Sequence, residues 1–418
     1  MRILLITSKP PFPGRLTGGG QRTDLLMRAL ERCGDLELVL AGPEHLCSAE
    51  DLDTLGRRWR LLGFHPWRAD LWAGPWRPLA ARLRGPVGRM AAALAFQSGS
   101  YGLDGPLARW LDTITDLRRY DVVVARHLAP LLRSGLLASG VPVVLDVDDL
   151  DSEVLRQRIR CGVSSLSPLL GRWLVCRLRA IEARAFRACS HLWLSSREDE
   201  RRLSLPHATL LPNVSWTPEG IPAAASVPGP GTGHVILFVG DLGYQPNSDG
   251  ISAFLRQAWP AIRQAVPQVR LRLVGPPPPL NLSLAWSRVA GVELCGYLND
   301  LAPAYAEAAL TIAPILWGGG TCIKVLESLA HARPCVLTIR ALQGHAGFLQ
   351  HGDSVWCAAD VAAMAEGCIR LLQDAPLGRA MGERGFDLVR RHASHSGFER
   401  IVRDTLVSIG NGPACSPL

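Results

Sequence analysis

Short apolar runs alternate with segments of helical periodicity along almost the whole chain, and this alternation constrains the fold more than any other feature. A strand, a helix and a further strand predict βαβ units, which build a mostly parallel sheet with helices on its faces. We therefore expect an α/β fold. The expected strands are Ile3–Thr7, Leu36–Ala41, Val122–Ala125, Val143–Val147, His191–Ser195, His234–Val239, Val269–Val274, Val292–Cys295, Leu310–Ala313 and Pro334–Thr338.

The length of 418 residues exceeds what one ordinary hydrophobic core accommodates, so we expect two domains. Residues 213–233 are rich in Pro, Gly, Ala and Ser, a composition that predicts a linker. The first domain would then span residues 1–212 and the second residues 234–395. A last helical pattern at residues 396–410 has no matching strand, and we expect it to pack back on the first domain.

The composition indicates a globular chain, with 48% hydrophobic and 20% charged residues. No run of about 18 uncharged apolar residues is present, so no transmembrane helix is expected. Met1–Thr7 predicts a buried strand rather than a signal peptide, because no longer apolar stretch follows it. The eleven cysteines lack CxxC spacing, which predicts neither a zinc site nor a disulfide framework and favours a cytoplasmic location.

The net charge of +8 comes largely from arginine, whereas lysine is nearly absent. Such a balance is compatible with nucleic acid, a membrane surface or an anionic substrate. No zinc finger, RNA-binding sheet motif or lysine-rich tail is present, so no nucleic-acid partner is expected.

A glycine-rich turn at residues 313–330 carries the clearest chemical signal. Gly318, Gly319 and Gly320 follow a predicted strand and let the backbone approach a ligand closely. A helix follows from Thr321, and the free N–H groups and dipole of its first turn suit a phosphate. Lys324 would add positive charge against a diphosphate, and Glu327 could accept hydrogen bonds from two ribose hydroxyls. An ordinary strand–helix turn is the alternative interpretation.

A second glycine-rich loop follows the first predicted strand. Gly18, Gly19, Gly20 and Arg22 lead into a helix expected near Thr23–Arg32. In α/β folds ligands bind at the carboxyl ends of strands, so this loop is a candidate for contacts with phosphate or acceptor. It is not a GxGxxG sequence and predicts no dinucleotide site. With one glycine-rich turn in each domain, we expect a ligand cleft between them.

Five elements of the chain occur in the order found in the GT-B fold retaining glycosyltransferases of the group 1, family 4-like type, and they resemble that family's motifs. In the second domain, Phe238–Gly250 is similar to "FVG-x-x-x-Y-x-PN-x-D", Leu294–Leu301 to "G-x-v-x-D-l", and Ala313–Ala330 to "aPl-x-x-G-G-x-x-x-K-v-l-E-a-m-A". Pro212–Val214, at the end of the first domain, is similar to "pN-g-v", and Val143–Glu153 with Glu182 and Ser195–Glu198 resembles the acceptor domain of the same branch. The resemblance covers nearly the whole chain.

This resemblance implies two Rossmann-like domains that face each other across a cleft. It also implies transfer of a sugar from a nucleotide-diphosphate sugar to a hydroxyl acceptor, with retention at the anomeric carbon and without a metal or other cofactor. The acceptor would be a glycan, a lipid-linked molecule or a small molecule. Glu327 would bind the donor ribose, and Gly18–Gly20 would close over phosphate or acceptor. The remaining implied donor-site residues are Gly240, Asn247, Cys295, Gly296, Tyr297, Gly318, Gly319, Gly320, Thr321 and Cys322.

The chain departs from the family pattern at two places. Gly319 occupies the position where the family often has a glutamate, eight residues before the ribose-binding one. The loop 244–247 lacks the basic residue that many members direct at the diphosphate. Lys324 is the best substitute, and Arg22 and Arg126 are second choices. These departures motivate two alternatives, a non-catalytic nucleotide-sugar-binding protein and a nucleotide-sugar epimerase.

Arg126, His127 and Asp148 follow two predicted strands and complete the catalytic candidates together with Lys324. His127 would orient a hydroxyl of donor or acceptor; a packed or exposed histidine is the alternative. Asp148 or Asp149 would bind acceptor, whereas helix capping in a solvated turn is the alternative.

Tryptophans interleaved with arginines mark Arg57–Met90, which contains Trp59, Trp67, Trp72 and Trp76. This pattern predicts peripheral contact with a membrane's inner face, and a two-helix insertion is the alternative. The arginine-rich segment Arg172–Arg187 predicts an amphipathic structural helix. Its inward side chains are expected to be Trp173, Leu174, Leu178, Ile181 and Phe186.

Overall fold

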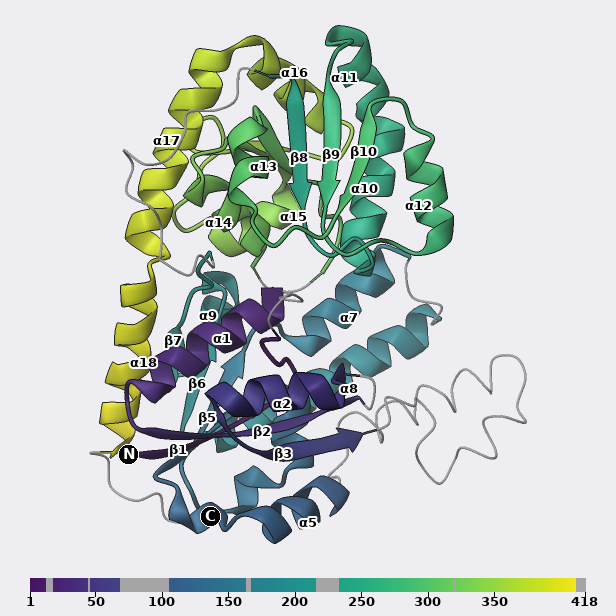
Figure 1. Cartoon of the computed structure of the whole chain (residues 1–418). Coiled ribbons are helices and arrows are strands. Elements are labelled where there is room, and N and C mark those ends of the chain that lie inside the picture. The colour runs from purple at the N-terminus through teal and green to yellow at the C-terminus, as the bar shows by residue number, and fades with distance from the viewer. Residues whose placement is uncertain are drawn as a thin grey trace. The chain divides into compact units, whose positions relative to one another are not determined.

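The computed structural model describes residues 1–12, 18–43, 46–67, 105–162, 167–215, 233–318 and 321–410, which form two compact units (Figure 1). The first unit holds Met1–Ser195, Asp199–Leu211 and the described residues from Glu399 onward. The second holds Ser196–Glu198 and Pro212–Phe398. Residues 213–215 of the predicted linker are buried within the second unit, so the structure shortens that linker at its start. The rest of it, up to residue 232, lies outside the described residues.

The first unit is built on a parallel sheet in the order β3-β2-β1-β4-β5-β6-β7. Its strands are β1 (Arg2–Thr7), β2 (Asp35–Pro43), β3 (Arg60–Trp67), β4 (Val122–Arg126), β5 (Val143–Val147), β6 (His191–Leu194) and β7 (Ala208–Leu210). The residues of β4 and β5 are buried throughout, as expected for strands covered on both faces.

Helices flank this sheet, and several begin at recognisable caps. Ser48 forms a capping box with Asp51 at the start of α2, and Ser167 precedes Pro168 at the start of α8. The helices are α1 (Gly18–Glu31), α2 (Ala49–Arg58), α5 (Gly105–Ile114), α6 (Leu128–Arg133), α7 (Asp151–Arg160), α8 (Pro168–Ala188) and α9 (Arg197–Leu203), whose first two residues group with the second unit.

The second unit contains a parallel sheet in the order β10-β9-β8-β11-β12-β13. Its strands are β8 (Val235–Val239), β9 (Arg270–Val274), β10 (Val292–Gly296), β11 (Leu310–Ala313), β12 (Cys335–Thr338) and β13 (Trp356–Ala358). Its helices are α10 (Gln245–Gln257), α11 (Trp259–Ala265), α12 (Leu280–Ser287), α13 (Ala302–Glu307), α14 (Ile323–Ala330), α15 (Ile339–Leu342), α16 (Met364–Gln373) and α17 (Ala375–His392).

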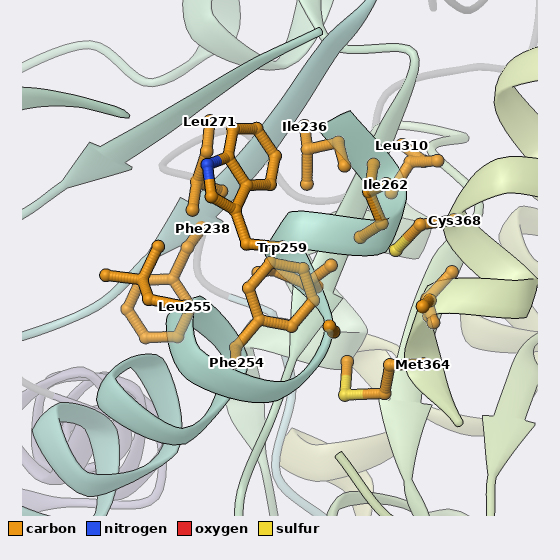
Figure 2. Close-up of a cluster of buried hydrophobic side chains, with 14 of the residues drawn as sticks. Ile236, Phe238, Phe254, Leu255, Trp259, Ile262, Leu271, Leu310, Met364 and Cys368 are labelled. Carbon is orange, nitrogen blue, oxygen red and sulfur yellow. The ribbon is translucent and has the colours of Figure 1, made fainter. Parts of the chain in front are cut away.

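A large apolar core lies against one face of the second sheet (Figure 2). Phe238 of β8 and Leu271 of β9 pack with Phe254 of α10 and Trp259 of α11, all of them buried. The indole N–H of Trp259 donates to the carbonyl of Ala290 at 3.1 Å, so this large side chain is buried with its polar atom satisfied. This core holds β8 in place, and β8 leads directly to Gly240, one of the predicted donor-site residues.

The helix at the carboxyl end of the described chain, α18 (His395–Gly410), contributes its later residues to the first unit. Val402 and Leu406, four residues apart, are both buried. The indole N–H of Trp193, in β6, donates to the hydroxyl of Thr405 at 3.1 Å. Glu399 forms an ion pair with Arg32. These contacts join a segment at the end of the chain to a strand far earlier in the sequence, as the separation of 212 positions in the Trp193–Thr405 bond illustrates.

The α/β fold class predicted from the sequence is confirmed, but three strands were missed. These are β3, β7 and β13. Residues 245–265 form two consecutive helices, α10 and α11. Pro260 lies in the first turn of α11, where its missing N–H costs nothing, and the chain turns at Ala258.

Two expectations about tryptophans were wrong. Trp59 is buried, so it is not exposed toward a membrane. The residues directly after it form strand β3, whereas the alternative interpretation expected a two-helix insertion there. Trp173 points outward and is 40% exposed. Trp72 and Trp76 lie outside the described residues, as does the side chain of Trp67. None of the helices in the described ranges is both long enough and apolar enough to cross a membrane.

Candidate functional site

The second sheet has a topological switch point between β8 and β11. The chain proceeds from β8 outward through β9 and β10, then returns to place β11 on the other side of β8. Ligands of open α/β sheets bind where the strand order reverses, at the carboxyl ends of the strands. Gly240 directly follows β8, and the turn that contains Gly318 follows β11. The two predicted donor loops therefore begin at neighbouring strand ends.

Glycine backbones meet closely at this edge. Gly275, after β9, has a φ of +142°, and a Cβ there would lie only 2.0 Å from the carbonyl oxygen of Gly240. No other residue type fits this contact. The N–H of Gly240 donates to Val274 at 2.9 Å, and that of Gly275 donates to Gly296 at 2.8 Å. These bonds fix Gly240 and Gly296 relative to each other.

The two predicted neighbours of Gly296 differ in exposure. Cys295 is half-buried and packs beside the core of β8 and β9, while Tyr297 is 43% exposed at the same strand end. The segment 295–297 therefore offers an aromatic side chain and backbone groups at the rim of the edge.

Lys324 joins the two loops. Its ammonium nitrogen donates to Oδ1 of Asn247 at 3.0 Å and lies 5.4 Å from the ring centroid of Phe238. The Nδ2 group of Asn247 in turn donates to the carbonyl of Asp241 at 2.7 Å. Lys324 is in the first turn of α14, where the helix dipole is positive. The structure thus brings together three predicted residues, Gly240, Asn247 and Lys324.

Glu327 lies one turn further along α14 and is buried, with 7% exposure. Burial raises the pKa of Glu327 to about 7, although a hydrogen bond from Tyr305 and the charge of Lys324 oppose this rise. The ring of Tyr305 is itself fixed by stacking on His331, with centroids 4.3 Å apart. The carboxyl group is therefore held in one position and titrates near neutral pH.

The turn before α14 is tied down from several sides. The side-chain amide of Asn213 donates to the hydroxyl of Thr321, and Nε2 of His345 donates to the carbonyl of Cys322 at 3.1 Å. Arg340 donates to the carbonyl of Gly318. Gly319 and Gly320, both predicted to bind donor, lie outside the described residues.

The first sheet also has a switch point, between β1 and β4. Gly18, Gly19 and Gly20 were expected in a loop after β1, but they form the first turn of α1, so the helix begins five residues before the predicted Thr23. The carbonyl of Gly19 accepts a hydrogen bond from Arg126 at 3.0 Å. The glycines are therefore attached to the end of β4.

An ion network fills the interior beneath this edge. Asp146, fully buried, accepts from Nε and Nη2 of Arg22, the shortest distance being 2.6 Å, and also pairs with Arg126. Arg22 donates further to the carbonyl of Leu211 at 3.0 Å. Arg22 and Arg126 are 2% and 0% exposed. Because they are buried, the two arginines are placed to hold the surrounding loops rather than to contact a phosphate directly, the role for which both had been candidates.

Asp148 and His127 lie beside Arg126 in this network. Arg126 donates to Oδ2 of Asp148 at 3.0 Å, and the side chain of Asp148 is 15% exposed. His127 has a φ of +71°, which is strained for a residue with a side chain. Burial, with the charge of Arg126, lowers the pKa of His127 to about 3, so the imidazole is neutral. Its Nε2 has no hydrogen-bond partner among the described residues.

Several residues at these edges were not found from the sequence. Phe238 lies under Lys324, Tyr305 holds Glu327, and Asp146 joins the two arginines. The acidic run at residues 146–151 was a usable signal for Asp146. Phe238 and Tyr305 fall within apolar patterns that predict only core packing.

Comparisons with known proteins bear on the second unit and on the fold of the whole chain. Residues 233–374 match the family model described as glycosyl transferases group 1. The structure is similar to sucrose-phosphate synthase from Thermosynechococcus elongatus, with a TM-score of 0.65 at 15% identity, covering 97% of this chain and 99% of that one.

It is also similar to Anabaena Alr3699/HepE in complex with UDP and glucose, with a TM-score of 0.64 at 14% identity, covering 98% of this chain and 100% of that one. WaaG, a glycosyltransferase involved in lipopolysaccharide biosynthesis, gives a TM-score of 0.59 at 14% identity, covering 99% of this chain and 100% of that one. No curated protein matches the sequence. Residues 233–374 therefore form a group 1 glycosyl transferase domain, carried by a chain that has the GT-B fold.

Proposed function

We propose that this chain is an active glycosyltransferase that moves a sugar from a nucleotide-diphosphate sugar to a hydroxyl acceptor with retention of anomeric configuration. The observation that carries the proposal is the pairing of Lys324 and Glu327 on the first two turns of α14, at a sheet switch point within a group 1 glycosyl transferase domain. The acceptor would be a glycan, a lipid-linked molecule or a small molecule.

In this proposal the buried carboxylate of Glu327 accepts hydrogen bonds from the ribose hydroxyls. The ammonium group of Lys324 and the N–H groups at the start of α14 bind the diphosphate. When the bond from the anomeric carbon to the diphosphate oxygen breaks, negative charge grows on that oxygen, and these groups stabilise it. The acceptor oxygen bonds to the same carbon, and its proton leaves with the nucleoside diphosphate. The charge stabilisation that a metal would supply comes from Lys324 and the helix, so we propose no cofactor.

His127 and Asp148 are the proposed acceptor-side residues of the first unit. A neutral imidazole with an unsatisfied Nε2 can orient a hydroxyl as either donor or acceptor, depending on its tautomer. Arg126 would act through Asp148, to which it donates, and so would be a positioning residue. Arg22 holds the same network through Asp146.

The first experiment is a thermal-shift panel of UDP, GDP, ADP, TDP and their common sugar conjugates. A ligand that binds only the folded state raises the melting temperature with its occupancy. We use UDP as the reference because the similar HepE structure is a complex with UDP and glucose. A strong shift from one nucleotide would define the donor class. The absence of a shift from every compound would contradict the proposal.

Replacing Glu327 by glutamine is expected to weaken donor binding about tenfold or more at pH 8, because the charged hydrogen-bond acceptor of the ribose is lost. The wild type should itself bind about tenfold more weakly at pH 6 than at pH 8, since a carboxyl group with a pKa near 7 is mostly protonated at pH 6. Titration calorimetry with the nucleotide-diphosphate sugar measures both effects.

The sugar conjugate is the right probe because both of its phosphates are esterified and do not titrate in this range. Glu327→Gln should show a flat pH profile. An unchanged affinity in Glu327→Gln, or a pH dependence that the variant retains, would remove Glu327 from the ribose site.

The second candidate function is a non-catalytic nucleotide-sugar-binding protein. It is motivated by Gly319 at the position of the family glutamate and by the loop 244–247, which has no basic residue. Nuclear magnetic resonance of the donor in the presence of the protein separates the candidates. Release of nucleoside diphosphate with transfer or slow hydrolysis indicates a transferase. Saturable binding with an unchanged donor indicates the binder, and inversion of a ring carbon indicates an epimerase.

A further inference from the structure

The outward face of α8 combines exposed apolar and cationic side chains in one stripe. Leu169, Trp173, Arg177, Arg184 and Arg187 follow one another at helical spacings of three, four or seven residues, so they share a side of the helix. Leu169 is 80% exposed and Trp173 is 40% exposed. The two apolar side chains lie at the beginning of the helix and the arginines along the rest.

The inward face of α8 is already occupied. Leu174, Leu178 and Phe186 are buried in the first unit together with Glu182. The carboxylate of Glu182 accepts from the backbone N–H of Ser152 at 2.9 Å and from its hydroxyl. Glu182 is the only acidic residue of Pro168–Ala188, and it faces away from the arginine stripe. The helix therefore has a fixed orientation that leaves its positive charge outward.

The outer arginines are not neutralised within the described part of the chain. Arg172, Arg177, Arg184 and Arg187 form no ion pair there, whereas Arg179, at the side of the stripe, lies 3.9 Å from Glu153. The guanidinium carbon of Arg177 lies 5.1 Å from the ring centroid of Trp173, a cation–π contact on the surface.

We propose that this face of α8 docks on the surface of a lipid bilayer that contains anionic lipid. Indole rings are favoured at the depth of the headgroups, and guanidinium groups pair with phosphate there. The exposed Leu169 and Trp173 would enter the apolar boundary, while Arg177, Arg184 and Arg187 meet the charge. A soluble polyanion would satisfy the arginines but would leave the two apolar side chains in water, so the combination favours a membrane. The inference does not depend on the proposed transferase activity.

The test is sedimentation of the full chain with vesicles of phosphatidylcholine alone or with phosphatidylglycerol added. We expect binding to the anionic vesicles that weakens as salt is raised, and none to the neutral ones. The double variant R184Q/R187Q should bind about 30-fold more weakly, since each arginine near an anionic surface contributes roughly a fivefold factor. Glutamine preserves helix propensity, so the helix should remain formed.

The matched control is R390Q/R391Q, which removes the same charge from exposed arginines in the last turn of another helix, α17. It should bind like the wild type. W173Q, which changes no charge, should weaken binding severalfold and make the remainder more sensitive to salt. Circular dichroism checks that each variant is folded.

Three outcomes would overturn the proposal. The first is that the wild type fails to sediment with anionic vesicles. The second is that R184Q/R187Q binds as well as the wild type or no worse than the control, and the third is that the chain binds heparin but not vesicles. The last result would identify the face as a site for soluble polyanions.

Discussion

Asp146→Asn is expected to lower the free energy of unfolding of the first unit by about 3–5 kcal/mol, because it removes the carboxylate that pairs directly with two buried guanidinium groups. Arg126 keeps its ion pair with Asp148, whereas Arg22 loses the carboxylate that contacts it. In the wild type Asp146 is fully buried between Arg22 and Arg126. An asparagine amide has the same shape but cannot compensate either charge. Urea unfolding followed by circular dichroism measures the change.

The control for this prediction is Asp53→Asn, in the same unit. Asp53 pairs with Arg57, but both side chains are mostly exposed, so the cost should be only about 0–1 kcal/mol. A loss for Asp146→Asn as small as that of the control would show that the interior arginines are compensated in some other way.

The pH dependence of the same network has a definite sign. Burial alone would raise the pKa of Asp146, but the charges of Arg22 and Arg126 lower it overall. A carboxyl group with a lowered pKa stabilises the folded state above its unfolded pKa, 3.8, and loses that contribution as the pH falls toward its folded value. The stability difference between wild type and Asp146→Asn should therefore shrink below about pH 4.

Lys324→Ala is expected to slow sugar transfer by about 10²–10³-fold, because the loss of one fixed donor at a developing oxyanion has effects of that size. The ammonium group lies where Asn247 and the start of α14 converge, and the neighbouring loop 244–247 provides no other cation. Binding of a nucleoside diphosphate should weaken more than binding of the nucleoside. Initial rates and titration calorimetry measure the two effects.

Lys324→Arg should recover part of the rate, because it restores the charge but not the compact geometry. Arg256→Ala removes an exposed cation from α10 in the same unit and should leave the rate unchanged. Equal weakening of nucleoside and nucleoside diphosphate in Lys324→Ala would mean that Lys324 only supports the fold through Asn247.

The pattern of apolar residues along the chain located most strands. It missed the strands that form only because a neighbouring strand pairs with them. The missed strand β3 contains Gly63 and Pro66, and β7 and β13 have only three residues each. Glycine and proline are poor strand formers in isolation. Beside a neighbour such as β2, which pairs along the whole of β3, the sequence becomes a strand because its backbone groups find partners.

The orientation of α8 was decided in the same way. Apolar residues occur on more than one side of this helix, and Trp173 was expected to face inward with Leu174 and Leu178. The structure instead turns Glu182 inward, because Ser152 of α7 supplies two hydrogen bonds to its carboxylate. Trp173 is then left outside. No local pattern indicates that a glutamate should be buried, since its partner is 30 residues away.

The sequence by itself determined the α/β class, the order of most strands, and the glycine-rich turn that leads into the helix carrying Lys324 and Glu327. Periodicity and backbone freedom are local properties, so they can be read along the chain. Only the tertiary structure decided which groups hold these residues. Asp146 meets Arg22 from 124 positions away, and Glu327 meets Tyr305 from another helix. Such pairs form because the strand order brings distant residues to one sheet edge, and burial there makes an unpartnered charge too costly to leave.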